Sequence, residues 1–146
     1  LDGWNAESDA ATLLNNLGIE DSLHYEIMEN LDSKLKVKVL LAQALFGNPD
    51  ILLLDEPFAA LDYQTRLSVC DDVYKIIRSE KKTALLITHD ISEAISVADR
   101  IFVLSKRPAE IVAEHDIEFP ESEPLKRREN KHFSRWFETL WKELNA

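Results

Sequence analysis

Residues 51–57 read ILLLDEP, and this stretch decides the fold. A continuous run of branched apolar residues is typical of a strand that is buried in a parallel sheet. The run ends in Asp55 and Glu56, so the strand delivers two carboxylates to its carboxyl end. In open α/β sheets, ligands bind beyond the carboxyl ends of the strands. The stretch therefore predicts a buried strand that leads directly into a functional site.

The segments that follow repeat the same pattern of apolar strand and helix. Asp62 is expected to open the first helix as its N-cap. Strands that alternate with helices imply a parallel sheet covered on both faces, and hence an α/β fold with three layers. The expected elements are a helix over 62–79, a strand over 83–88, a helix over 91–98 and a strand over 100–105.

His89 directly follows the second of these strands, as Asp55 and Glu56 follow the first. Parallel strands present their carboxyl ends at one edge of the sheet. We therefore expect Asp55, Glu56 and His89 to line one cleft.

The two flanks of the chain are expected to be mainly helical. They divide it into a helical segment at 1–48, an α/β core at 49–118, and a linker with a C-terminal amphipathic helix at 119–146. The expected flanking elements are a helix capped by Asn5 and stopped by Gly18, a short helix at 22–30, a helix at 34–46, a strand from 109 to about 117, and a helix at 125–144.

Composition narrows the class of protein. The chain has 146 residues, with 17 Lys and Arg against 27 Asp and Glu, which gives a net charge of −10. This charge opposes nonspecific binding to nucleic acid, so no nucleic-acid partner is predicted. A lone Cys70 and the lack of a signal or spanning segment favour a cytoplasmic location. The first residue is not Met, so we expect the chain to be a piece of a longer protein.

Three motifs in fixed order resemble those of the ATP-binding-cassette (ABC) ATPases: residues 51–57 the Walker B strand, 60–62 the D-loop, and 88–90 the switch-histidine loop. The resemblance implies ATP and Mg²⁺ as ligands. By the same resemblance, Asp55 would hold Mg²⁺ through water, Glu56 would be the general base, His89 would contact the γ-phosphate, and Asp62 would communicate across a dimer.

The loop that would hold the phosphates is absent from the sequence. A P-loop requires Gly-x-x-x-x-Gly-Lys-Ser/Thr, and none of the three glycines of the chain fits this pattern. The stretch at 31–35 occupies the place of the family signature, but Ser33 and Lys34 replace its two glycines. Ser33 therefore stays a nucleotide-contact candidate with a poor motif match. We expect a partial P-loop-NTPase-like sheet that binds MgATP weakly and is inactive alone.

Two finer resemblances divide the chain. Residues 1–57 resemble F-type ABC proteins that act on ribosomes, whereas residues 58–146 resemble the ATPases of nitrate, sulfonate and taurine importers. The amino-acid sequence thus suggests a hybrid of the two types, joined at residues 55–58. Our interpretation is a partial nucleotide-binding domain of an importer ATPase. Two alternatives remain open, an F-type translation-factor fragment and a catalytically silent hybrid.

The resemblance also implies partners. A second ATPase domain would bind head to tail, and a permease would hold the assembly at the inner face of the membrane. Because the P-loop strand would lie between the strands at 83–88 and 100–105, its absence leaves a gap. We expect these strands to pair directly or their exposed edges to recruit another chain, including a second copy.

Overall fold

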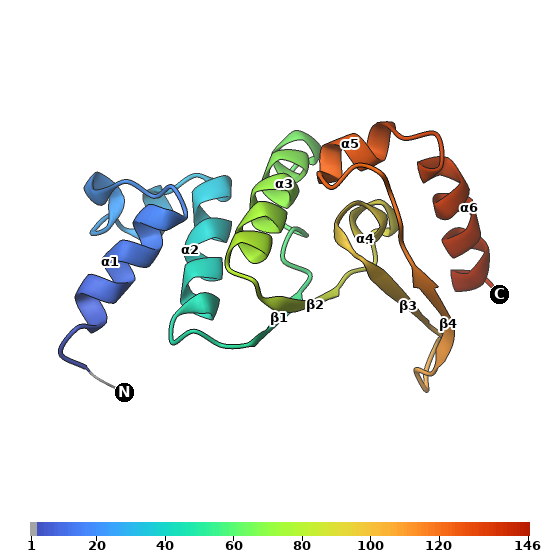
Figure 1. Ribbon diagram of the computed structural model, residues 1–146, viewed down its shortest axis with the longest axis horizontal. Helices are drawn as coiled ribbons and strands as arrows, with labels where there is room; N and C mark the ends of the chain where they lie inside the picture. Colours follow the sequence, from blue (N-terminus) through green and yellow to red (C-terminus); the bar gives the residue numbers. More distant parts are fainter. Residues whose placement is uncertain (1–2) are drawn as a thin grey trace. The chain divides into compact units, whose positions relative to one another are not determined.

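The computed structural model describes residues 3–146 as an α/β protein (Figure 1), so the first two residues of the predicted segment 1–48 lie outside the described part. The chain forms two compact units, which end and begin at Leu85 and Leu86. The predicted three-part division at 1–48, 49–118 and 119–146 stays a prediction.

The first unit contains most of the predicted helices. Its elements are α1 (Ala6–Asn16), two 3₁₀ turns η1 (Asp21–Leu23) and η2 (Met28–Asn30), α2 (Ser33–Leu45), β1 (Ile51–Asp55), α3 (Tyr63–Ser79) and the first half of β2 (Thr83–Ile87). The second unit holds the end of β2, then α4 (Ile91–Val97), β3 (Arg100–Leu104), β4 (Ile111–Asp116), α5 (Pro124–Glu129) and α6 (Phe133–Leu144).

Gly18 ends α1 as predicted. Its φ of 73° lies in the left-handed region, where glycine carries no steric penalty. The Gly18 N–H donates to the Asn15 carbonyl at 2.9 Å and the Ile19 N–H donates to the Leu14 carbonyl at 3.0 Å, which is the hydrogen-bond pair of a Schellman motif. At the other end of α1, the Asn5 side chain makes no capping hydrogen bond, so that part of the prediction is wrong.

Aspartates cap the three helices that follow. The side chains of Asp32, Asp62 and Asp90 accept hydrogen bonds from backbone N–H groups in the first turns of α2, α3 and α4. These bonds satisfy donors that have no partner within the helix, and a negative charge at this end also suits the helix dipole. The chain therefore turns into each helix at a defined residue.

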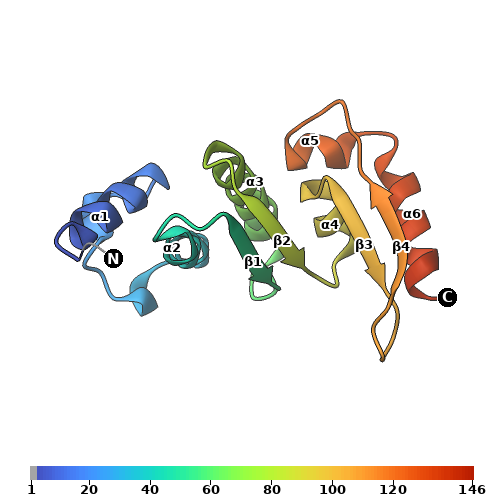
Figure 2. The ribbon, with the colours of Figure 1, turned by 60° about the horizontal axis from the view of Figure 1, so that its bottom comes forward.

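β1 and β2 pair side by side and run in the same direction (Figure 2). The strand β1 buries Leu52, whereas its neighbours Ile51 and Leu53 are 67% and 64% exposed. On β2, Leu85 and Ile87 are 53% and 46% exposed. Successive residues of a strand face opposite sides, so each strand has large apolar side chains on an uncovered face. The predicted parallel pairing is confirmed, but in the described residues one apolar face of each strand meets solvent.

β3 and β4 form an antiparallel pair with its own core (Figure 2). Ile101 and Val103 on β3 are buried, whereas Phe102 and Leu104 on its other face are exposed. The core of this unit is completed by α4 and α6. It consists of Ile91, Ile95, Ile101, Val103, Ile117 and Leu140.

Arg127 ties α5 to this unit. Its side chain is buried, and it donates hydrogen bonds to the Ala98 carbonyl at 2.8 Å and the Glu121 carbonyl at 3.3 Å. The guanidinium also lies 5.7 Å from the centre of the Phe119 ring. A buried cation needs such partners because it has lost its water.

Two predicted helices are wrong in part. The segment predicted as a helix at 22–30 is two 3₁₀ turns, because the Glu26 side chain accepts from the Ile27 N–H and from the Asn30 amide. The helix predicted at 125–144 is broken between α5 and α6. Asn130 is extended there, and its side-chain oxygen accepts from the His132 N–H at 2.9 Å.

The expectation that the strands at 83–88 and 100–105 pair directly is also wrong. β2 pairs with β1 and β3 pairs with β4, in two separate sheets. A short loop returns the chain from β3 into β4, and β4 occupies one edge of β3. The alternative, that exposed edges recruit another chain, stays a prediction.

No helix within residues 3–146 combines the length and the apolar character that crossing a lipid bilayer requires.

An ion-pair cluster joins α2 to α3. The Asp72 carboxylate accepts from Lys34 Nζ at 3.0 Å and lies 3.3 Å from Lys38 Nζ. Burial alone would raise the pKa of Asp72, but the Lys34 hydrogen bond and the charges of both lysines outweigh burial and lower this pKa. Because the folded-state pKa lies below the unfolded value of about 3.9, the pair stabilises the protein fully above that pH. The stabilisation is lost as the pH falls through the folded-state pKa.

Asp72→Asn is therefore expected to lower the free energy of unfolding at pH 7 by about 1 kcal/mol, a modest value because solvent screens a partly exposed pair. The difference between variant and parent should shrink as the pH falls below about 4, through the folded-state pKa of Asp72. Urea unfolding at several pH values measures both effects. Asp50→Asn, which removes the same charge from an exposed site, serves as the control. Equal stability of Asp72→Asn and the parent at pH 7 would contradict the assigned role.

Candidate functional site

Asp55 and Glu56 lie where β1 ends. Asp55 is the last residue of the strand and is exposed, and Glu56 is half-buried in the turn that follows. The φ of Glu56 is 46°, in the left-handed region that is uncommon for residues other than glycine. The Ala59 N–H donates to the Glu56 carbonyl at 3.2 Å and closes the turn. Such backbone strain clusters at functional sites, where the surrounding structure holds it in place.

Asp62 is the N-cap of α3. Its Oδ1 atom accepts from the N–H groups of Gln64 and Thr65, each at 3.1 Å. Hydrogen bonds from the Thr65 side chain and backbone lower the pKa of Asp62. The carboxylate is therefore held ionised at the start of the helix.

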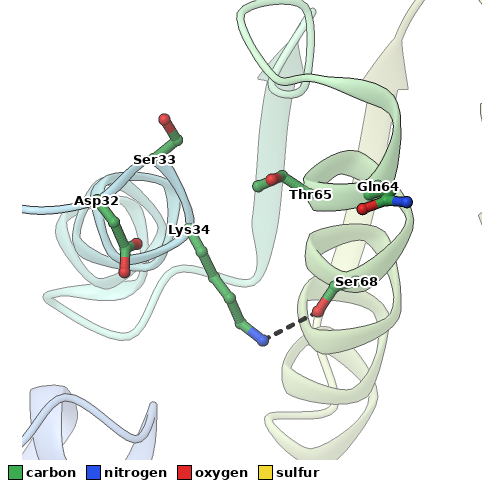
Figure 3. Close-up of a pocket in the computed structure, with 6 residues that line it drawn as sticks. All are labelled: Asp32, Ser33, Lys34, Gln64, Thr65 and Ser68. Carbon is green, nitrogen blue, oxygen red and sulfur yellow. Dashed lines mark hydrogen bonds between the residues drawn. The ribbon is translucent and has the colours of Figure 1, made fainter.

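Ser33 is the first residue of α2, and the Asp32 side chain caps this helix by accepting from the Leu35 N–H at 2.8 Å. Lys34 extends toward α3, where its Nζ donates to Ser68 Oγ at 3.0 Å (Figure 3). In the family signature, glycines allow backbone N–H groups to approach a phosphate. Here the same positions carry side chains, and Lys34 is already engaged with Ser68 and Asp72.

An open pocket of about 490 Å³ lies between the first turns of α2 and α3 (Figure 3). Gln64, Thr65 and Ser68 line it from α3, although the sequence did not mark them as site residues. They follow the Asp62 cap by two, three and six residues, which places them on the first two turns of α3. This spacing from the cap is the sequence feature that could have identified them. The other lining residues are Asp32, Ser33 and Lys34.

His89 is an exposed residue of the loop between β2 and α4. The next residue, Asp90, caps α4 through its Oδ1 atom, which accepts from the Ser92 N–H at 2.8 Å and the Glu93 N–H at 3.2 Å. The loop around His89 is therefore short and fixed to the helix that follows it.

The structure brings some of the predicted residues together. Asp55 and Glu56 are neighbours at one strand end, and Ser33 shares its pocket with the first turns of α3, which Asp62 caps. His89 belongs to the unit that starts at Leu86, so its convergence with Asp55 and Glu56 stays a prediction.

The described residues do not form a metal cage of their own. Across residues 3–146, no group of three His, Cys, Asp or Glu side chains is placed to hold one. Mg²⁺ usually keeps several waters and binds through one or two carboxylates together with substrate phosphates. The single exposed carboxylate of Asp55 fits that mode of binding and does not fit a cage made by the protein alone.

No protein-family model matches the chain. The uncharacterized ABC transporter ATP-binding protein YtlC of Bacillus subtilis is 40% identical over 99% of this chain and 57% of its own length. The aliphatic sulfonates import ATP-binding protein SsuB 1 of Mesorhizobium japonicum is 38% identical over 86% of this chain and 45% of its own length. The chain thus spans about half the length of the curated relatives it matches. The similarity to YtlC runs across residues 55–58, where the predicted join stays a prediction.

Solved structures show the same fold. MJ1267, an ATP-binding cassette of an ABC transporter in its ADP conformation, has a TM-score of 0.65 over 94% of this chain and 51% of its own, at 18% identity. The cassette MJ0796, in a dimeric post-hydrolysis state with ADP and Pi, has a TM-score of 0.59 at 26% identity, over 82% of this chain and 50% of its own.

The sequence similarity and the shared fold agree with the strand that ends in two carboxylates and with the capped helices that follow the strands. This chain is a homologue of the ATP-binding proteins of ABC transporters and has the fold of about half of an ABC ATPase domain.

Proposed function

We propose that this chain is the part of an importer ATPase domain that supplies the hydrolytic groups, and that it acts only with the part that carries the phosphate-binding loop. The apolar faces of β1 and β2 carry the proposal. Ile51, Leu53, Leu85 and Ile87 remain between 46% and 67% exposed in a two-stranded sheet. Parallel sheets in α/β proteins are covered on both faces, so a further polypeptide segment would cover this one.

The proposed roles follow the residues of the site. Asp55 would be the protein ligand of Mg²⁺, directly or through water, and the metal would neutralise charge on the phosphates. Glu56 would accept the proton of the attacking water. The turn that holds its backbone at a positive φ would fix the position from which its side chain extends. His89 would contact the γ-phosphate. Asp62 and Ser33 would face a second ATPase domain, and the dimeric state of MJ0796 supports a dimer.

The solute class and location come from the relatives. SsuB 1 is named for the import of aliphatic sulfonates, so we propose a solute of the nitrate, sulfonate or taurine type and a permease partner. The whole protein would then lie on the cytoplasmic side of the membrane. These transporter relatives favour an importer ATPase over an F-type translation factor.

Reconstitution tests the proposal. The purified chain should release no phosphate from MgATP by itself, because positioning and charge stabilisation of the triphosphate are missing. Addition of the segment of YtlC that lies outside the match should produce hydrolysis. In that mixture, Glu56→Gln should lower the rate by about 10² to 10⁴-fold, the typical contribution of a general base. Hydrolysis that Glu56→Gln leaves unchanged would overturn the role of Glu56.

Two matched substitutions test the exposed sheet face in the same assay. Leu53→Lys places a charge on that face and should abolish reconstitution while the chain itself stays folded. Leu40→Lys makes the same change on α2, where Leu40 is 56% exposed, and should leave reconstitution intact. If both variants reconstitute hydrolysis equally well, the face does not bind the added segment.

The backbone of Glu56 gives a further prediction. A left-handed φ costs residues with a Cβ atom about 1 kcal/mol, whereas glycine adopts it freely. Glu56→Gly should therefore be more stable than Glu56→Ala by about 1 kcal/mol, although both variants lack the carboxylate. Thermal and urea unfolding measure the difference. A Glu56→Ala variant that is as stable as Glu56→Gly would show that this turn stores no strain.

A further inference from the structure

The loop that carries His89 is attached to a buried carboxylate. Glu93 lies on α4 and is only 2% exposed. Its Oε2 atom accepts a hydrogen bond from Thr88 Oγ1 at 2.8 Å. Thr88 is the residue immediately before His89, so the buried acid reaches the loop through one hydroxyl group.

The same hydroxyl group also holds the residue after His89. The Asp90 N–H donates to Thr88 Oγ1 at 3.0 Å. Asp90 in turn accepts from the N–H groups of Ser92 and Glu93 with its side chain. Both neighbours of His89 are therefore fixed to the first turn of α4, and every group in this network lies in the unit that begins at Leu86.

Glu93 is a buried carboxylate on a helix that also buries apolar residues. A buried carboxylate loses its hydration and is tolerated only when it is hydrogen-bonded, and an apolar residue of similar volume is often at least as stabilising. The neighbours Ile91 and Ile95 on α4 are buried apolar residues, which an aliphatic side chain would suit. Unlike a leucine at position 93, the Glu93 carboxylate accepts a directional hydrogen bond, and this bond restricts the Thr88 hydroxyl group.

We propose that Glu93 is a positioning residue for His89. Through Thr88 Oγ1 it holds the backbone on both sides of His89 in one conformation, so that the imidazole is presented from a fixed loop. The proposal rests on the proposed role of His89 at the γ-phosphate, but its structural part concerns the order of the loop and does not depend on hydrolysis.

Amide hydrogen exchange and ¹⁵N relaxation of the full chain test this part. Glu93→Leu removes the acceptor, so the Asp90 amide should exchange about tenfold faster and the order parameter of His89 should fall. Glu93→Gln retains an acceptor oxygen and should stay within about twofold of the parent at both positions. Thr88→Val and Thr88→Ser form a second pair, in which only the serine keeps the hydroxyl group and should preserve the order of His89.

Two outcomes would overturn the proposal: an ordered His89 in both Glu93→Leu and Thr88→Val, or equal loss of order in the conservative and nonconservative variants of both pairs. If Glu93→Leu does not fold, the two Thr88 variants decide. In the reconstituted mixture, Glu93→Leu should lower kcat at least tenfold with little change in KM, and Glu93→Gln should restore it. If the parent mixture does not hydrolyse ATP, the proposed function fails, and the exchange data still decide whether Glu93 positions the loop.

Discussion

The turns from strand to helix depend on one interaction, the capping of a helix by an aspartate. Asp62 caps α3 after β1, and Asp90 caps α4 after β2. Each cap fixes the residue at which the helix begins, so the segment between strand and helix has a defined length. Asp55, Glu56 and His89 all lie in or beside these segments. The hydrogen bonds that end these turns therefore fix the backbone next to the candidate site residues.

One-sided burial is the second constraint. β1 and β3 each bury one face and leave large apolar residues on the other, such as Leu53 and Phe102. The relatives extend well beyond the matched region, and the chain covers 57% of YtlC. Uncovered sheet faces and a partial match are two independent signs of the same arrangement. Both support the proposal that a further segment completes the domain around Asp55 and Glu56.

Much of the fold could be predicted because local signals were strong. The apolar run before Asp55, the cap at Asp62 and the stop at Gly18 each act within a few residues, and β1, α3 and the end of α1 agree with them. The break at Asn130 was missed because the apolar stripe starts only at Phe133 and the polar residues before it give no periodic signal. In the structure the Asn130 side chain accepts from the His132 N–H and donates to Glu121. The short loop at 105–110 placed β3 beside β4.

The candidate site could be predicted only in part, because local sequence signals do not show which side chains meet in the folded chain. Motif order identified Asp55, Glu56 and His89, but no motif showed that Lys34 would reach Ser68 or that Glu93 would reach Thr88. Those contacts depend on how side chains lie once the helices have formed.

The binding of MgATP by the isolated chain is the most direct test of whether the phosphate-binding machinery is missing. Isothermal titration calorimetry at several millimolar nucleotide should give a Kd of about 1 mM or weaker, equivalent to about 4 kcal/mol, because Asp55 alone offers a single carboxylate for Mg²⁺. A Kd in the micromolar range that survives Asp55→Asn would show that this chain holds a complete phosphate site, and the half-domain interpretation would then be wrong.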